Sequence, residues 1–381
     1  MDLDLTWLLW GLPLAFALGW VASRLDLRQW RMESRQTPKA YFRGLNHLLN
    51  EQQDQAIDAF IEAVQGDPDT AELHFALGNL FRRRGDYDRA VRVHEHLLAR
   101  ADLDRKDRDR AQHALAMDFL KAGLLDRAES ALHKLEGSAY EAEALMALLA
   151  IAERSRDWPQ AQGLAQRLED THQGSFAPRL GHYLCEEAEL AQSKGDATEA
   201  LRLLKKAVER APEQARGWMA LSALRSQQGD AQGAFDSLKS LARHAPQGLP
   251  LAARPIADLS VATGRQAEAV ELLNEAQAHA PSLDITEALA ALSGNAQSAR
   301  AHYLQHLERE PSLVIAAQWL AGETFSDPVA QKRVQAALEQ ASNPLKRYRC
   351  AACGFEARQH FWHCPGCQSW DSYPARRVEE L

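Results

Sequence analysis

A short phrase recurs along most of the chain and limits what the chain can fold into. The phrase is a glycine, several polar residues and an alanine, as in GDYDRA, which ends at Ala90, and GDATEA, which ends at Ala200. In two of the copies another residue replaces the glycine. The final alanines are separated by 34, 38, 33, 39, 34, 35 and 30 residues; they are Ala56, Ala90, Ala128, Ala161, Ala200, Ala234, Ala269 and Ala299. A period near 34 residues predicts stacked helical hairpins, each of which buries its apolar face against its neighbours.

Proline marks the boundaries between the hairpins. It stands twelve residues after the alanine in five repeats, at Pro68, Pro212, Pro246, Pro281 and Pro311. Glycine accepts the left-handed conformation that ends a first helix, and proline cannot continue a second helix. The pattern resembles the tetratricopeptide repeat and predicts about eight repeats over residues 37–311, with a helical cap over 312–345. Because alanine and leucine are abundant and strand formers are sparse, we expect an all-α superhelix.

An uncharged segment at the N-terminus predicts a membrane anchor. Residues 5–23 contain no charged side chain. As a helix they would span about 28 Å, close to the thickness of a bilayer core. Tryptophan favours the two membrane interfaces, and Trp7, Trp10 and Trp20 lie toward the two ends of the segment. We therefore expect residues 1–23 to form a single transmembrane helix.

The charges around this segment predict its orientation. Asp2 and Asp4 precede it, and a basic cluster follows it, at Arg24, Arg28, Arg31 and Arg35. A cleaved signal peptide, the alternative interpretation, carries its basic residues before the apolar run. The positive-inside rule predicts an external N-terminus and a cytoplasmic body. Residues 24–36 would then be a basic juxtamembrane segment that can also touch anionic phospholipids of the bilayer.

The cysteines predict a metal site. Four of the five lie within 18 residues as two C-x-x-C pairs separated by ten residues: Cys350, Cys353, Cys364 and Cys367. Four thiolates at this spacing can meet at one tetrahedral ion. Gly354 and Pro365 favour tight turns beside the pairs. The remaining cysteine, Cys185, lies in a helical stretch, where we expect a small buried apolar residue.

The region around these cysteines, residues 346–381, is too short to build a large core. Six aromatic residues fall between positions 348 and 373, and metal and aromatic rings together must hold such a domain. The region resembles a rubredoxin-type or zinc-ribbon knuckle. Zn²⁺ is favoured over iron because no second redox motif accompanies the site, and a four-cysteine shell leaves no open position for a hydrolytic water. His360 and His363 are expected to pack or lie at the surface.

The concave face of such a superhelix can bind peptides or other proteins. Counting from the repeat alanines, the first helices of the second and third repeats would present inward Phe75, Asn79, Arg82, Arg83, His113, Met117 and Lys121. An asparagine with basic neighbours can hold a carboxylate or a peptide backbone. An ordinary solvated helix face is the alternative interpretation of the same residues.

Charge and motif content narrow the function. The net charge is −8, and residues 44–345 carry about −12, so nucleic acid is not an expected partner because an acidic body repels phosphate. The sequence contains no phosphate-binding loop, dinucleotide fingerprint, zinc-protease motif or nucleophile elbow. We therefore expect a non-enzymatic protein.

The order of the parts resembles the lipopolysaccharide assembly protein B family of Gram-negative bacteria. The resemblance rests on the segment over residues 5–23, the repeats, and RYRCAACGF with WHCPGCQSW within residues 347–370. It implies a single-pass inner-membrane adaptor with a periplasmic N-terminus and four cysteine ligands for one metal ion. The adaptor would help a membrane-anchored AAA+ protease degrade the deacetylase that commits carbon to lipid A, and would coordinate lipopolysaccharide assembly. An inner-membrane regulator that senses lipopolysaccharide would oppose it.

Two other functions remain open from the residues alone. One is a general tetratricopeptide co-chaperone that binds carboxylates through Asn79. The other is an electron carrier with a rubredoxin-like iron site. The resemblance favours the adaptor over both.

Overall fold

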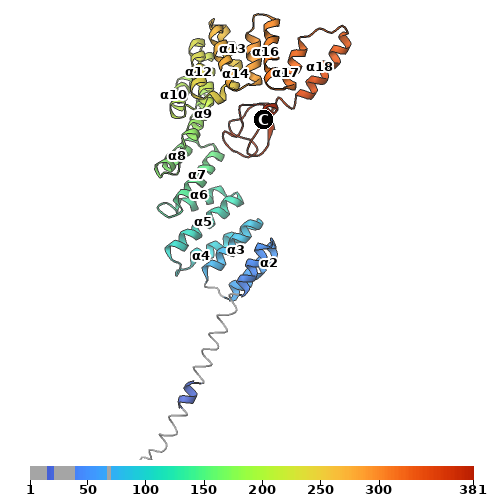
Figure 1. Ribbon diagram of the computed structural model, residues 1–381. Coiled ribbons are helices and arrows are strands. Elements are labelled where there is room, and N and C mark those ends of the chain that lie inside the picture. The colour runs from blue at the N-terminus through green and yellow to red at the C-terminus, as the bar shows by residue number, and fades with distance from the viewer. Residues whose placement is uncertain (1–14, 21–38, 67–69) are drawn as a thin grey trace, which may run out of the picture. The chain divides into compact units, whose positions relative to one another are not determined.

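The computed structural model describes residues 15–20, 39–66 and 70–381. The chain divides into two compact units, residues 1–156 and 157–381. Both units are built from antiparallel helical hairpins, as the ribbon in Figure 1 shows. The tetratricopeptide prediction for the body of the chain is therefore confirmed.

The first unit contains a helix over residues 39–49 and six further helices. They are α2 (Gln53–Gly66), α3 (Ala71–Arg84), α4 (Tyr87–Ala99), α5 (Arg105–Ala122), α6 (Leu125–His133) and α7 (Glu141–Ser155). Each helix packs on the one that precedes it from α3 onward. One core cluster joins the first two hairpins and contains Phe60 of α2 and Phe81 of α3.

The second unit contains one single helix and five helical pairs that follow it. Its helices are α8 (Trp158–Asp170), α9 (Ala177–Ser193), α10 (Ala197–Arg210), α11 (Ala215–Gln227), α12 (Ala231–His244), η1 (Pro246–Gly248), α13 (Leu249–Thr263), α14 (Gln266–His279), α15 (Leu283–Leu292), α16 (Ala296–Arg309), α17 (Leu313–Ala321) and α18 (Pro328–Ser342). A short hairpin follows, with β1 (Tyr348–Arg349) antiparallel to β2 (Glu356–Ala357), and η2 (Val378–Glu380) ends the chain.

The repeated phrase acts where the two helices of a hairpin cross. Seven of its eight alanines are 0 % exposed, whereas the last, Ala299, is half-buried. Alanine is required there because a larger side chain would push the crossing helices apart. The preceding glycines end first helices in the left-handed conformation, with φ of 87° at Gly85, 76° at Gly123 and 70° at Gly264. At Arg156, where glycine is replaced, the chain still adopts φ of 57°.

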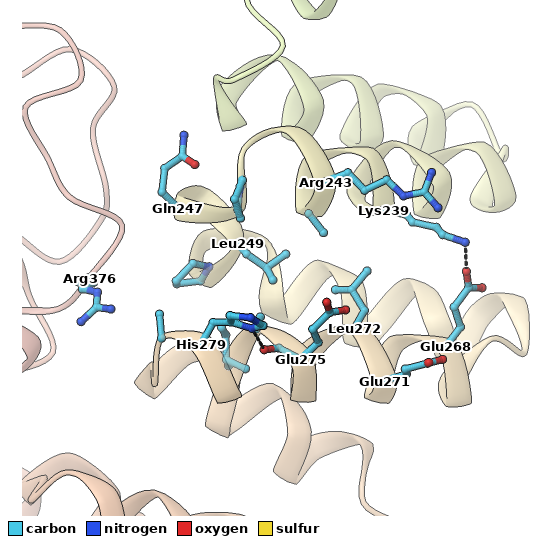
Figure 2. A pocket seen from close by; sticks show the side chains of 16 residues that line it. Lys239, Arg243, Gln247, Leu249, Glu268, Glu271, Leu272, Glu275, His279 and Arg376 are labelled. Atoms are coloured by element: carbon cyan, nitrogen blue, oxygen red, sulfur yellow. Dashed lines mark hydrogen bonds and ion pairs between the residues drawn. The ribbon is translucent and has the colours of Figure 1, made fainter.

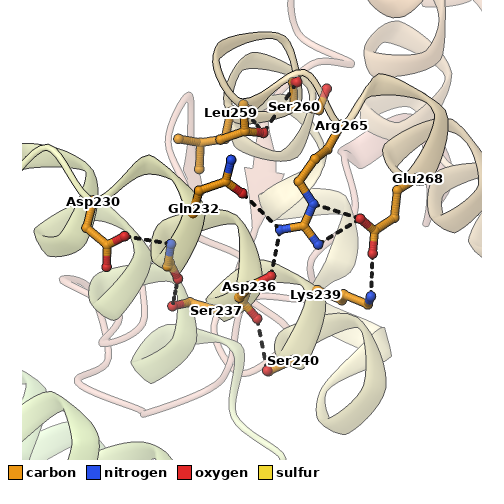
Figure 3. Close-up of polar contacts among 12 residues, drawn as sticks. Asp230, Gln232, Asp236, Ser237, Lys239, Ser240, Leu259, Ser260, Arg265 and Glu268 are labelled. Atoms are coloured by element: carbon orange, nitrogen blue, oxygen red, sulfur yellow. Dashed lines mark hydrogen bonds and ion pairs between the residues drawn. The ribbon is translucent and has the colours of Figure 1, made fainter.

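Polar contacts join neighbouring second helices at the surface. Between α12 and α14, Arg265 donates to Asp236 Oδ1 at 2.7 Å and to Glu268 Oε2 at 2.8 Å, and Lys239 also binds Glu268. Figure 3 shows this chain of charges running from one helix to the next. The Arg265 guanidinium also lies 4.3 Å from the centre of the Phe235 ring. These contacts join α14 to α12 of the preceding repeat.

The proposed anchor falls mostly outside the described residues. Residues 15–20 are helical, but the rest of the segment over residues 1–23 and the basic segment over 24–36 are not described. Within the described part of the chain, no helix combines the length and apolarity needed to cross a membrane.

Candidate metal centre and its contact with the repeats

The four predicted ligands come together at one point. Their Sγ atoms all lie within 4.8 Å of one another. The Sγ atoms of Cys350 and Cys367 are 3.8 Å apart, and those of Cys353 and Cys364 are 3.7 Å apart. A tetrahedron with metal–sulfur bonds of about 2.3 Å has edges of about 3.8 Å. The geometry of the cluster therefore fits a single ion bound by four cysteines.

Two turns with the same hydrogen bonds present the four thiols. In the first, Gly354 N donates to Cys350 O at 2.9 Å; in the second, Gln368 N donates to Cys364 O at 2.8 Å. The residue after each second cysteine has a positive φ, 78° at Gly354 and 59° at Gln368. Glycine adopts this conformation at little cost. The sequence therefore indicated the first turn, whereas Gln368 gave no such signal.

The surroundings of the thiols shift the pKa values of Cys350 and Cys353 in opposite directions. Burial opposes ionisation of Cys350, but the Ser372 hydroxyl and two backbone amides lower its pKa to about 6. The Ser369 side chain lowers the pKa of Cys367. Although the Phe355 amide favours its charged form, burial and the three neighbouring thiols raise the pKa of Cys353 to about 12. Four thiolates this close repel one another, and a bound cation would offset that repulsion.

The metal domain lies against the first helices of the second unit's repeats. It contacts α9, α13, α15 and α17, together with Gln214 and Arg216 at the start of α11. In Figure 1 the dark red C-terminal ribbon lies on the inner side of these helices. Leu251 of α13 completes the small core of the domain beside Tyr348 and Phe361. The first helices of this unit are thus contacted by the chain's own C-terminus.

A buried histidine forms the centre of the contact. His182 is 0 % exposed, and its Nε2 lies 2.8 Å from Asp371 Oδ1. Arg216 Nη1 lies 3.5 Å from its other nitrogen, Nδ1, and Gln214 Nε2 lies 2.8 Å from Nε2. Burial lowers the pKa of His182, the Asp371 carboxylate opposes this shift, and the Arg216 charge adds to it. Gln214 Nε2 donates to Asp371 Oδ2 at 2.9 Å.

Aromatic rings surround this histidine. The Trp370 ring stacks on His182 with centroids 4.6 Å apart and contacts Tyr183 and Trp158 edge-on at 6.1 and 6.3 Å. Trp362 lies 6.3 Å from His182 and packs against the core of α12–α15. Trp370 comes three residues after Cys367, so the fold of the second metal turn sets the position of its ring.

The C-terminal tail of the metal domain contacts the starts of α15 and α17. Glu379 accepts from the backbone N–H groups of Leu313 and Val314, and Glu380 accepts from Leu283 N at 2.8 Å. Both carboxylates thereby cap helix N-termini, where negative charge is favourable. Arg377 donates to Asp284 at 2.6 and 3.0 Å.

The predicted groove residues of the first unit occupy different environments. Phe75 is 1 % exposed in the core, under the Arg110 guanidinium. Arg82 donates to Asp118 Oδ1 at 2.9 Å and to Asn79. His113 stacks on the Tyr140 ring at 4.8 Å. Met117 is half-buried, and Arg83 and Lys121 are exposed. Binding of a partner here stays a prediction.

Sequence reasoning missed the residues that join the metal domain to the repeats. Trp370 belonged to a recognised aromatic cluster, but no pattern linked it to His182, 188 positions earlier. The buried Arg216, which donates to Glu186 at 2.8 Å and Glu189 at 2.9 Å, gave no signal either. Buried polar residues at contacts between distant segments leave no periodic trace in a sequence.

Comparisons with known proteins agree with this architecture. A family described as rubredoxin metal binding domain matches residues 348–373, and tetratricopeptide repeat families match residues 73–109 and 185–248. The chain is 30 % identical to lipopolysaccharide assembly protein B of Escherichia coli K12, over 100 % of both chains. It is 27 % identical to the protein of that name from Haemophilus influenzae, over 95 % of this chain and 96 % of that one. A tetratricopeptide repeat protein from Parabacteroides merdae is similar at 14 % identity and a TM-score of 0.35, over 67 % of this chain and 98 % of that one.

Proposed function

Because the chain belongs to the lipopolysaccharide assembly protein B family, we propose that it is a non-enzymatic inner-membrane scaffold that regulates lipopolysaccharide synthesis. The observation that carries the proposal is the match over the full length of both chains. In this chain the match spans the segment before the repeats, the repeats themselves and the metal domain.

The scaffold promotes degradation of the deacetylase that commits carbon to lipid A, by a membrane-anchored AAA+ protease. Residues 5–23 hold it in the inner membrane, with the repeats on the cytoplasmic side. Confinement to the membrane of the protease raises the effective concentration of the client without a new contact. A lipopolysaccharide-sensing membrane protein opposes this activity.

The metal domain has a structural role in this proposal. The four cysteines hold one ion, for which we favour Zn²⁺, because all four positions are thiolates and no coordination position stays open. The ion keeps Trp370 and Asp371 aligned with His182. The metal domain then stays docked on the repeats, and the second unit presents one fixed surface to its partners.

The test is the half-life of the deacetylase in cells depleted of this protein. We expect a long half-life on depletion that the wild-type chain shortens, and that neither a chain lacking residues 1–23 nor Cys364→Ser with Cys367→Ser restores. Cys185→Ala is the control, because it removes the cysteine that lies outside the metal centre. An unchanged half-life on depletion would refute the regulatory role and leave a membrane scaffold with other partners.

A further inference from the structure

The outer side of the second unit carries a groove between two second helices. It lies between α12 and α14, with the start of α13 at its floor, and has a volume of about 780 Å³. Leu249, Leu272 and Ile285 line the floor. Figure 2 shows Leu249 and Leu272 projecting into the space between the two helices. The metal domain lies against the first helices of this unit, and it contributes Arg376 to the lining of the groove.

The two walls of the groove carry opposite charges. Lys239 and Arg243 stand on α12, while Glu268, Glu271 and Glu275 follow one line along α14. Figure 2 shows the basic side chains of α12 above the acidic side chains of α14. Lys239 and Glu268 bind each other at one end.

The remaining charged side chains of the walls can pair with an occupant of the groove. Among the residues that the structure describes, no ion pair engages Arg243, Glu271 or Glu275, and all three are exposed. Arg376 reaches the groove from the C-terminal tail and has no ion pair in the described part of the chain either. An occupant with apolar side chains in the middle and charges of both signs at its flanks would pair with these groups.

The walls also restrict the backbone of an occupant. Both are helices, whose peptide groups bond within the helix. The amide of Gln247 already donates to Glu213 O at 2.8 Å, and His279 Nδ1 lies 2.8 Å from Glu275 O. An extended peptide would find no free backbone edge to pair with along these walls. A helix satisfies its own backbone, as in other helix-in-groove complexes.

We propose that this groove binds an amphipathic helix of a partner protein. The helix lays its apolar side chains on Leu249 and Leu272, its basic side chains toward α14 and its acidic side chains toward α12. From Glu268 to His279 the wall extends over about 16 Å, so about three turns of the partner make contact. The carboxylates of α14 disfavour an anionic lipid headgroup. The proposal goes beyond the regulatory role and does not depend on it.

Photocrosslinking in the full-length chain tests the proposal. p-Benzoylphenylalanine replaces Ala280, an exposed residue that lines the groove, or Lys205, an exposed residue of α10, as control. In living cells of the source bacterium we expect a discrete product at position 280 and none at 205. Mass spectrometry should place the crosslink in a partner segment with apolar residues at helical spacing and basic residues along one flank.

Charge reversal then decides whether the walls recognise that segment. Glu271→Lys with Glu275→Lys should reduce the crosslink at least tenfold, and reversal of the partner's basic residues should restore it. Glu209→Lys with Glu308→Lys, exposed positions of the same unit that do not line the groove, is the control and should leave the crosslink unchanged. The proposal would be overturned if no product forms, or if the product contains lipid or a second copy of this chain. It would also be overturned if the crosslinked segment lacks the pattern, or if charge reversal leaves the crosslink yield unchanged.

Discussion

Replacement of Trp370 by alanine should release the metal domain from the repeats. The ring contacts three aromatic groups of the repeats, His182 at 4.6 Å, Tyr183 at 6.1 Å and Trp158 at 6.3 Å. Each such pair contributes about 0.5–1.5 kcal/mol beyond burial, or about 3 kcal/mol together. Since about 1.4 kcal/mol is a factor of ten, the detached population should rise about 100-fold.

Limited trypsin digestion of the purified metal-loaded chain measures this change. The domain and its linker contain Lys346, Arg347, Arg349, Arg358, Arg376 and Arg377. When opening is fast relative to cleavage, the cleavage rate follows the open population, so we expect cleavage about 100-fold faster in Trp370→Ala.

Two controls separate release from unfolding of the domain itself. Trp370 also stacks on His363 at 4.3 Å within the metal domain, so the variant must retain the wild-type metal content. Phe355→Ala removes a ring that is 44 % exposed on the same domain and should change the rate little. The reasoning is refuted if Trp370→Ala keeps its metal and is cleaved less than about threefold faster than the wild type, well short of the ratio that about 3 kcal/mol requires.

Three further predictions concern other groups. Because burial lowers the pKa of His182 from 6.5, the neutral form stabilises the second unit above that pH, and this stability is lost as the pH falls through the lowered value. Urea unfolding between about pH 5 and 8 should show this loss in the wild type and less of it in His182→Gln; superimposable profiles would disprove the role of His182. In the first unit, Asp118 is 0 % exposed and accepts from Arg82 and from His94 at 2.5 Å, so Asp118→Ala should lower the free energy of unfolding by about 3–5 kcal/mol. The exposed Asp58→Ala should cost less than about 0.5 kcal/mol in the same denaturant titration, and equal effects of the two variants would contradict the buried network. Finally, elemental analysis should find one metal ion per wild-type chain and none in Cys364→Ser with Cys367→Ser; a colourless protein with zinc would exclude the iron alternative, whereas a red protein with iron would exclude zinc.

The sequence by itself determined the repeat architecture and indicated the cluster of four cysteines. Both follow from local rules: a buried alanine at each helix crossing recurs at a nearly fixed spacing, and paired cysteines must lie in tight turns to share an ion. Ala56 and Ala269 are accordingly 0 % exposed, and the four Sγ atoms meet within 4.8 Å. The family resemblance also followed from these features, because their order along the chain is visible without coordinates.

Only the tertiary structure decided what each surface faces. The contact of Trp370 and Asp371 with His182 joins residues 188 and 189 positions apart, and the groove between α12 and α14 depends on how two repeats stack. The same structure placed Phe75 in the core, although counting along the helix had assigned it to the inner groove. Periodicity fixes which side of a helix is apolar. Which neighbour covers that side depends on packing between segments that are distant in sequence, and local patterns carry no record of it.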